Sequence, residues 1–207
     1  PRAGRLRRHQ GRRRGVIPTP DSLRAAGFTG LRVVGDVHGD ARGFDAALAG
    51  AAAAGLFVIQ LGDLTDHGPD NPAVLRAIFA ALDAGRGLFL LGNHDHKLRR
   101  ALLGHAVRME REGLGRTLDQ IAAAPDAAAL KARAIAEIGR APAWLALGRL
   151  FFVHAAFHDG MLQHPSPPDA GTARPEGLVG RAIFGQVTGR RGPDGFPIRL
   201  TGWIDRI

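Results

Sequence analysis

Three apolar runs in the sequence each end in a glycine that is followed by side chains able to bind a metal ion. The runs cover residues 31–34, 57–61 and 88–91. The polar side chains that follow them are Asp36, His38, Asp63, Asn93 and His94. Carboxylate, imidazole and amide groups without thiolates suit Mn²⁺, Fe or Zn²⁺. The pattern predicts a hydrolase built around two divalent metal ions, with Mn²⁺ preferred and Fe or Zn²⁺ as alternatives.

The candidate ligands divide between the two ions. We expect Asp36 and His38 to hold the first ion. Asp63 can bridge both ions, because a carboxylate has two oxygen atoms. Asn93 and His154 can hold the second ion. Two ions about 4 Å apart can clamp a phosphate group and supply a bridging hydroxide for in-line attack.

The leaving oxygen of such a reaction needs a proton. His94 lies next to the candidate ligand Asn93 and can supply that proton as a general acid. Asp66 follows Asp63 by three residues and can accept a hydrogen bond from His94, which would fix the tautomer of the imidazole. We therefore assign the predicted catalytic roles to His94 and Asp66.

The elements that must position these side chains alternate between strands and helices. Apolar runs predict strands over residues 31–34, 56–61 and 88–91. Apolar residues at helical spacing predict helices over residues 40–54 and 73–84. This order is typical of a parallel sheet with crossover helices. Ligands of such sheets gather at the carboxyl ends of the strands, where all the candidate side chains fall.

The second half of the chain is less regular. Its predicted elements are three helices within residues 96–139, a hairpin over residues 144–147 and 149–153, a brief helix over residues 177–184 and a β-like run over residues 196–204. The helical block could form a cap whose arginines line the cleft. The alternative is an ordinary solvated helix face, because acidic side chains are interspersed among the arginines.

Composition sets limits on the class of protein. The 207 residues are enough for one α/β domain, and the absence of cysteine excludes disulfides and thiolate metal sites. No apolar run approaches the roughly 20 residues of a membrane-spanning helix. We expect a cytoplasmic protein.

The net charge of +9 comes mostly from residues 1–14, which hold seven arginines and no acid. Such a segment cannot bury a core and is typical of a disordered tail. We predict a disordered tail and linker over residues 1–27 and a catalytic domain over residues 28–207, with a helical cap over about 96–140. The tail could bind nucleic acid or anionic lipid, or it could be an N-terminus without function.

Four segments carry a resemblance to a known family. Residues 35–39 (GDVHG), 62–68 (GDLTDHG) and 92–95 (GNHD) resemble the GDxHG, GDxxDRG and GNH(D/E) motifs of calcineurin-like metallophosphoesterases of the phosphoprotein phosphatase type. Residues 153–155 (VHA) resemble a later metal-ligand motif of that family. The resemblance implies an α/β fold, a β-sandwich of mixed sheets flanked by helices. It also implies a dinuclear site that hydrolyses phosphomonoesters or phosphoanhydrides.

Within that family, two segments are similar to bacterial branches. Residues 92–98 and 184–189 resemble diadenosine tetraphosphate hydrolases and the phosphatase module of bacterial polynucleotide kinase-phosphatases. The expected substrate is therefore a phosphoprotein, a nucleotide or a polynucleotide end.

The sequence departs from the family pattern at two places. His67 replaces the arginine of GDxxDRG that grips substrate phosphate, so His67 is a candidate substrate contact and Arg99 or Arg100 could substitute for the arginine. The family also supplies a last metal histidine from a Gly-His motif, and this chain has no histidine after His164. We expect a C-terminal truncation, with a weakened second metal site or another ligand as alternatives.

Three functions remain open at this point. The first is a serine/threonine phosphatase-like phosphoesterase, in which a metal-bridging hydroxide attacks and His94 acts as general acid. The second is a polynucleotide or diadenosine-polyphosphate phosphatase. The third is a catalytically impaired, nucleic-acid-binding relative, which the replacement at His67 and the missing late histidine motivate.

Overall fold

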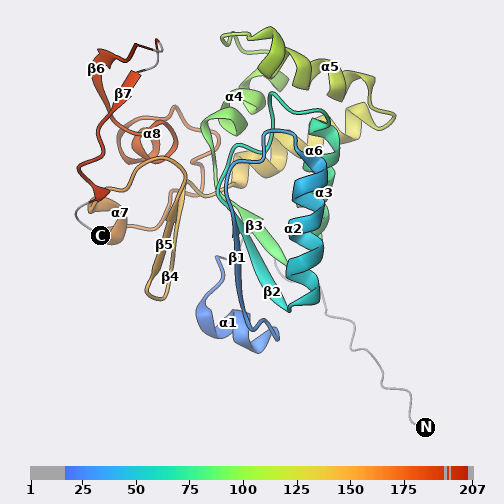
Figure 1. The fold of residues 1–207 in the computed structure, drawn as a ribbon, viewed down its shortest axis with the longest axis vertical. Coiled ribbons are helices and arrows are strands. Elements are labelled where there is room, and N and C mark those ends of the chain that lie inside the picture. The colour runs from blue at the N-terminus through green and yellow to red at the C-terminus, as the bar shows by residue number, and fades with distance from the viewer. Residues whose placement is uncertain (1–16, 194, 196, 205–207) are drawn as a thin grey trace.

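A three-stranded parallel sheet lies at the centre of the molecule (Figure 1). The structure, a computed structural model, describes residues 17–193, 195 and 197–204. The predicted arginine-rich tail, residues 1–14, lies outside these described residues. The strands are β1 (Gly30–Val34), β2 (Leu56–Gln60) and β3 (Gly87–Phe89), in the order β1-β2-β3.

The carboxyl ends of these strands are level. Val34 pairs with Gln60, and Gln60 pairs with Phe89. The three loops that follow the strands therefore start side by side, as the alternation of strands and helices predicted.

Helices α2 (Ala41–Ala53) and α3 (Asn71–Asp83) cover one face of the sheet (Figure 1). Both are capped by an aspartate: Asp40 accepts from the N–H of Gly43 at 2.9 Å, and Asp70 accepts from Ala73 at 3.0 Å. The cap at Asp70 starts α3 two residues earlier than the predicted 73.

The hairpin of β4 (Trp144–Leu147) and β5 (Leu150–Val153) is antiparallel, as predicted, and packs on the other face of the sheet. Side chains of β3 and the residues after it alternate between the two faces, because successive residues of a strand point to opposite sides. Phe89 and Leu91 belong to the core under the helices, whereas Leu88 and Leu90 pack toward the hairpin. This layering of parallel and antiparallel sheets with flanking helices confirms the predicted fold class.

Helix α1 (Pro20–Ala25) occupies part of the predicted linker. The Oγ1 of Thr19 accepts from the N–H of Ser22 at 3.1 Å, and the Ser22 side chain bonds back to Thr19, so the two residues form a capping box. Leu23 is buried against the sheet together with Phe57. Residues 20–25 are thus part of the folded domain rather than an open connection.

The helical block comprises α4 (Asn93–Leu102), a π-helical turn η1 (Arg111–Gly115), α5 (Arg116–Ala123) and α6 (Ala127–Arg140). The first of these helices begins at residue 93, three residues before the predicted start. The reason is local: the buried carboxylate of Asp95 accepts the N–H of Gly92 at 2.9 Å and caps the helix. Asn93 and His94 therefore lie in the first turn of a helix.

The C-terminal part holds α7 (Gly160–Gln163), α8 (Gly177–Phe184) and a separate antiparallel pair, β6 (Val187–Arg191) and β7 (Pro197–Arg199). The predicted helix over 177–184 is confirmed. The strand β6 was not predicted, because its sequence VTGRR has no apolar alternation. In the described part of the chain, no helix is both long and apolar enough to span a bilayer.

Candidate metal centre

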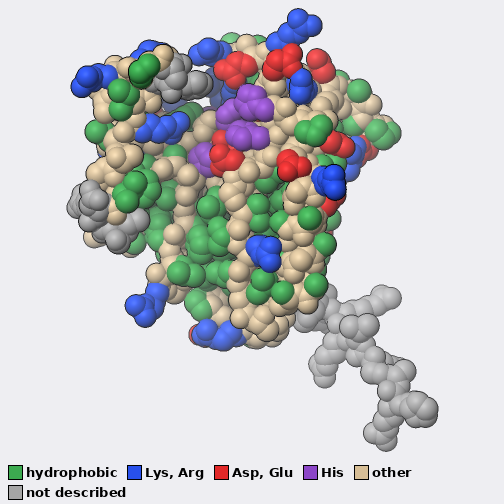
Figure 2. All heavy atoms as spheres, in the orientation of Figure 1, with side chains coloured by type: hydrophobic (Ala, Val, Ile, Leu, Met, Phe, Trp, Pro, Cys, Tyr) green, Lys and Arg blue, Asp and Glu red, His purple; other side chains and the backbone are tan. Residues whose placement is uncertain are grey.

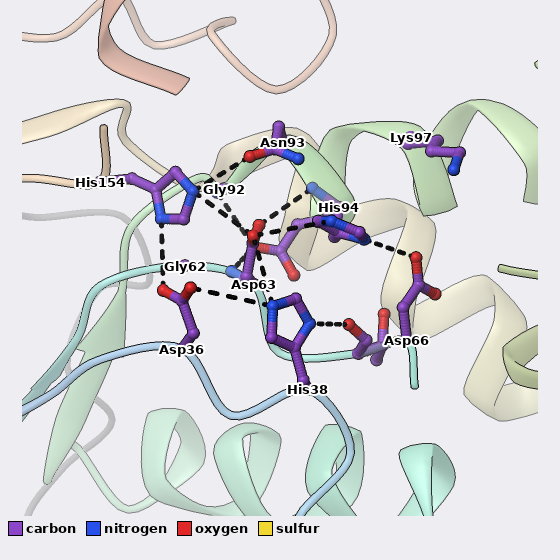
Figure 3. A network of polar contacts seen from close by, with 12 residues as sticks. Asp36, His38, Gly62, Asp63, Asp66, Gly92, Asn93, His94, Lys97 and His154 are labelled. Atoms are coloured by element: carbon purple, nitrogen blue, oxygen red, sulfur yellow. Dashed lines mark hydrogen bonds and ion pairs between the residues drawn. The ribbon is translucent and has the colours of Figure 1, made fainter. Parts of the chain in front are cut away.

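The segments that follow β1, β2, β3 and β5, including the first turn of α4, converge on one site at the carboxyl ends of the strands (Figure 3). The side chains that they bring together are Asp36, His38, Asp63, Asp66, Asn93, His94 and His154. All seven were predicted as metal ligands or catalytic groups. Figure 2 shows histidine side chains gathered beside acidic ones on the surface at this end of the molecule.

The first group of ligands consists of Asp36, His38 and Asp63, whose ligand atoms lie within 4.8 Å of one another. The Nε2 of His38 is 3.8 Å from Asp36 and 3.9 Å from Asp63, measured to the Oδ2 atoms. The Nδ1 of His38 lies 2.9 Å from the carbonyl oxygen of Thr65. Because a carbonyl can only accept, Nδ1 carries the proton and Nε2 presents its lone pair to the carboxylates.

The second group consists of Asp63, Asn93 and His154. The Nδ1 of His154 lies 2.9 Å from the carbonyl oxygen of Leu61 and donates to it. The Nε2 then presents a lone pair toward Asn93 Oδ1 at 3.1 Å and Asp63 Oδ2 at 3.4 Å. A proton on Nε2 or a divalent cation among the three groups would relieve the repulsion between these lone pairs. The donor set therefore fits a divalent metal ion.

The pKa values at the second group indicate the same preference for positive charge. Burial lowers the pKa of His154, but the hydrogen bond and charge of Asp63 and the charges of Asp95 and Asp36 outweigh burial, so the net shift is upward. Burial raises the pKa of Asp63, yet His154 and His94 outweigh burial and bring the net shift downward. The site thus keeps Asp63 ionised and attracts a cation.

Asp63 is central to both groups. Its Oδ2 lies 3.4, 3.9 and 4.0 Å from the Nε2 atoms of His154, His38 and His94, and its Oδ1 accepts the N–H of His94 at 2.9 Å. The side chain is only 5% exposed. A carboxylate in this position can contact both ions.

His94 is held by a different kind of partner. Its Nδ1 lies 2.6 Å from Oδ2 of the fully buried Asp66, whose Oδ1 accepts the hydroxyl of Thr117 at 2.7 Å. Burial lowers the pKa of His94, but the hydrogen bond to Asp66 and the charges of Asp63 and Asp66 raise it further than burial lowers it. The Nε2 of His94 is left facing the metal groups.

The backbone of the site is strained. Among the described residues, the non-glycine residues with positive φ are His38, Asp63, Asp66 and His67, at 46°, 58°, 81° and 65°. Such conformations cost of order 1–3 kcal/mol each and persist where the surroundings enforce them. All four belong to the loops after β1 and β2, so the strain lies in the segments that aim the ligands.

The loops also approach one another too closely for a side chain. A Cβ placed on Gly62, which has φ +100°, would lie 2.7 Å from the backbone of Gly92 and 3.0 Å from Nδ1 of His154. Glycine at this position lets the loops after β2 and β3 meet, which brings Asp63 and Asn93 together.

Comparison with known proteins agrees with this geometry. The model of the calcineurin-like phosphoesterase family matches residues 31–170, which is more than half of the chain. The chain belongs to this family. The predicted family, and with it the prediction of a metal-dependent hydrolase, is confirmed.

Relatives of this calcineurin-like phosphoesterase carry a common name. This chain is 27% identical over 150 residues to a bis(5′-nucleosyl)-tetraphosphatase PrpE (asymmetrical) of Geobacillus sp. strain WCH70. The match covers 70% of this chain and 57% of the relative. The chain is 28% identical over 199 residues to the PrpE of Geobacillus thermodenitrificans, covering 85% and 73%. It is 30% identical over 151 residues to that of Bacillus subtilis, covering 70% and 57%. The chain thus spans little more than half the length of two of these relatives.

The two predicted substrate contacts lie in different places. His67 joins the site: its imidazole is 5.3 Å from that of His38 and 5.7 Å from that of His94, centre to centre. The guanidinium of Arg99 packs against α6 instead, where its Nε donates to the carbonyl of Ile135 at 3.1 Å. The structure does not bring Arg99 to the metal groups. Five residues after His94 on α4, Arg99 lies on a different side of the helix.

The sequence analysis did not identify two residues that hold the site in place in this phosphoesterase. Asp95 accepts the N–H groups of Gly92, Asp63 and Leu64 at 2.8–3.0 Å and so ties the loops after β2 and β3 together. Burial, followed by the charge of Asp63, raises the pKa of Asp95 to about 6. An acidic residue three positions after the first residue of a helix cap, here Asp95 after Gly92, is the sequence signal that predicts this contact.

The other residue is Thr117. It lies on α5, 51 positions from Asp66, and no local pattern connects the two. Lys97 also lies near His94, where its charge opposes the rise in the pKa of that histidine, and its Nζ donates to Glu110 at 3.2 Å (Figure 3).

Proposed function

We propose that this phosphoesterase hydrolyses phosphoanhydride bonds in dinucleoside polyphosphates, with two divalent metal ions. Two observations support the proposal. The site gathers two ligand groups that share one carboxylate, Asp63. In addition, the relatives described above are named as bis(5′-nucleosyl)-tetraphosphatases. The sulfur-free donor set of His154, Asn93 and Asp63, gathered within hydrogen-bond distance, is the observation that carries the metal dependence.

In this proposal, Asp36, His38 and Asp63 hold the first ion, and Asp63, Asn93 and His154 hold the second. When bound, such a pair supplies the positive charge that orients a phosphate and makes water a nucleophile at neutral pH. Mn²⁺ is the preferred ion, because four of the six contacts come from carboxylate or amide oxygens if Asp63 is counted once for each ion. Fe and Zn²⁺ are the alternatives.

His94 acts as the proton donor at its Nε2 atom. Asp66 holds the Nδ1–H at 2.6 Å, so the imidazole ring is fixed and its protonated form is stabilised. The hydrogen bond to Asp66 and the charge of Asp63 raise the pKa of His94, which favours the protonated form that acts as the acid. Asp66 is a positioning residue, because it acts through His94.

His67 lies at the exposed edge of the site, where its imidazole can contact a substrate phosphate. It makes at most a single charge-assisted hydrogen bond, in contrast to the bidentate fork of an arginine. We expect phosphate affinity to depend weakly on this residue.

A surface cavity close to His154 in the sequence is a candidate place for the nucleoside part of a substrate. It begins at Ala156, two residues after His154, has a volume of about 220 Å³, and is lined by Phe157, Arg181 and Trp203 among others. Aromatic rings stack on nucleobases, and a guanidinium attracts phosphate.

The test is a substrate panel with the Mn²⁺-loaded full chain. Diadenosine tetraphosphate, a phosphothreonine peptide and a 5′-phosphorylated oligonucleotide are compared by kcat/KM, with phosphate or nucleotide release as readout. We expect the dinucleotide to lead by at least about tenfold. A lead of the peptide or the oligonucleotide would overturn the substrate class. Absence of turnover on all three, with metal bound, would overturn the enzymatic proposal itself.

A further inference from the structure

His38, His67 and His94 form a group that the reaction does not need as a unit; we call it the three-histidine cluster. Each imidazole offers one nitrogen, and the three nitrogens lie within 4.8 Å of one another. The ring centres are 4.9, 5.3 and 5.7 Å apart in the three pairs, and every pair meets edge to face.

We propose that the three-histidine cluster binds Zn²⁺ and that this binding switches the enzyme off. The binding part stands on the cluster alone, and the inhibitory part rests on the proposed function. The site differs from both ligand groups of the metal centre, because it contains no carboxylate or amide oxygen and depends on His67.

The cluster already has the hydrogen bonds that zinc ligands need. His38 donates its Nδ1–H to the carbonyl of Thr65, and His94 donates its Nδ1–H to the carboxylate of Asp66. A histidine that donates one ring N–H to a carbonyl or carboxylate presents its other nitrogen to the metal, which is the usual arrangement at zinc sites. Two of the three ligands are therefore pre-oriented.

Only a small movement completes the site. Zn–N bonds of about 2.0–2.1 Å in a tetrahedron place the ligand nitrogens roughly 3.4 Å apart. His67 is exposed and can rotate toward the two fixed rings. Three imidazoles leave the fourth position open to solvent.

The two kinds of site select different ions. The group of Asp36, His38 and Asp63 is rich in oxygen and suits Mn²⁺, whereas three nitrogens suit Zn²⁺. His38 belongs to both and cannot serve both through Nε2, so zinc in the cluster competes with the first metal ion. Zinc also occupies the Nε2 lone pair of His94 and displaces its proton to solvent, which leaves no proton for the leaving oxygen.

The test titrates Zn²⁺ into the Mn²⁺-loaded full chain and measures two quantities. The first is the zinc and manganese bound per chain after desalting, by elemental analysis. The second is turnover of diadenosine tetraphosphate, or of p-nitrophenyl phosphate, relative to each protein's own rate with Mn²⁺ alone. The variants are His67→Asn, which tolerates the positive φ at this position, His67→Cys, which restores a zinc ligand, and the control His105→Asn at an exposed site.

For the wild type and His105→Asn, we expect zinc uptake with loss of manganese and half-inhibition at the same zinc concentration. His67→Asn should need at least about tenfold more zinc for both effects, and His67→Cys should recover zinc uptake. Equal zinc uptake by wild type and His67→Asn would overturn the proposal. If no protein turns over substrate but zinc uptake still depends on His67, the zinc site stands and the proposed function fails.

Discussion

The histidines of the metal centre are held in two ways. His38 and His154, in the loops after β1 and β5, donate Nδ1–H to backbone carbonyls at 2.9 Å. His94, in the first turn of α4, donates to the buried carboxylate of Asp66 at 2.6 Å. A carbonyl carries no charge, so it orients a neutral ring that can bind a metal. A carboxylate stabilises the imidazolium and so suits a group that delivers a proton. A carboxylate partner therefore favours the imidazolium more than a carbonyl partner does, although both kinds of partner can orient a metal-binding nitrogen.

The largest effect is expected at Asp63, where both kinds of histidine meet. Asp63→Ala removes the shared ligand and leaves the two ions without a common carboxylate. We expect the chain to lose both ions and turnover to fall by more than about 10³-fold. Elemental analysis after gel filtration, together with kcat/KM, measures both effects. Turnover near that of the wild type would refute the bridging role.

A pair of variants tests the comparison directly. His154→Gln should lower the bound metal from two ions toward one per chain. His94→Gln should keep both ions and lower kcat by about 10²–10⁴-fold, as expected for loss of a general acid. If His94→Gln lost metal while His154→Gln kept both ions, the assignment of the two roles would be reversed.

A smaller effect is expected at Thr117, which acts on His94 only through Asp66. Thr117→Val keeps the shape of the side chain but removes the hydroxyl that donates to Asp66. Loss of one such bond, at about 1 kcal/mol, corresponds to roughly a fivefold fall in kcat with unchanged metal content. Thr29→Val is the matched control, because its hydroxyl bonds to the Ala54 carbonyl at the opposite end of β1. A fivefold loss in the control as well would point to a general packing effect.

The smallest effect is expected at an exposed carboxylate outside the site. The hydrogen bond of Arg76 lowers the pKa of Asp126. A lowered pKa means that the pair stabilises the fold above the ordinary carboxyl pKa of about 3.9 and loses this contribution as the pH falls through the lowered value. Arg76→Gln should therefore lower Tm slightly at pH 7, and the difference from wild type should vanish in strong acid. A difference that grew toward acid would contradict the assigned sign.

The sequence was sufficient to predict which candidate ligands the fold brings together, but not the groups that orient them. Asp36, Asp63 and Asn93 each follow an apolar run and a glycine, and the parallel sheet brings such positions together by its own geometry. His94 and Asp66 were paired correctly because their motifs lie at adjacent strand ends.

The supporting contacts depend on distant parts of the chain. Thr117 reaches Asp66 from α5, and the Leu61 carbonyl receives His154 across 93 positions. No periodicity or motif encodes such pairs, because they arise only when α5 and the β4–β5 hairpin pack on the sheet. Arg99 was predicted to substitute for the arginine that His67 replaces, but its guanidinium donates to Ile135 on α6 instead.

The distribution of the proposed ligands along the chain also determines the order in which the ions are released as the protein unfolds. The proposed ligands of the first ion, Asp36, His38 and Asp63, lie within a single strand–helix–strand unit. The second ion needs His154, which arrives only when the β4–β5 hairpin docks on the sheet. Opening of the hairpin breaks the second site and leaves the first intact. We expect mild denaturant to release one ion before the other, with the site of Asp36, His38 and Asp63 emptied last, which stepwise metal release during urea titration would reveal.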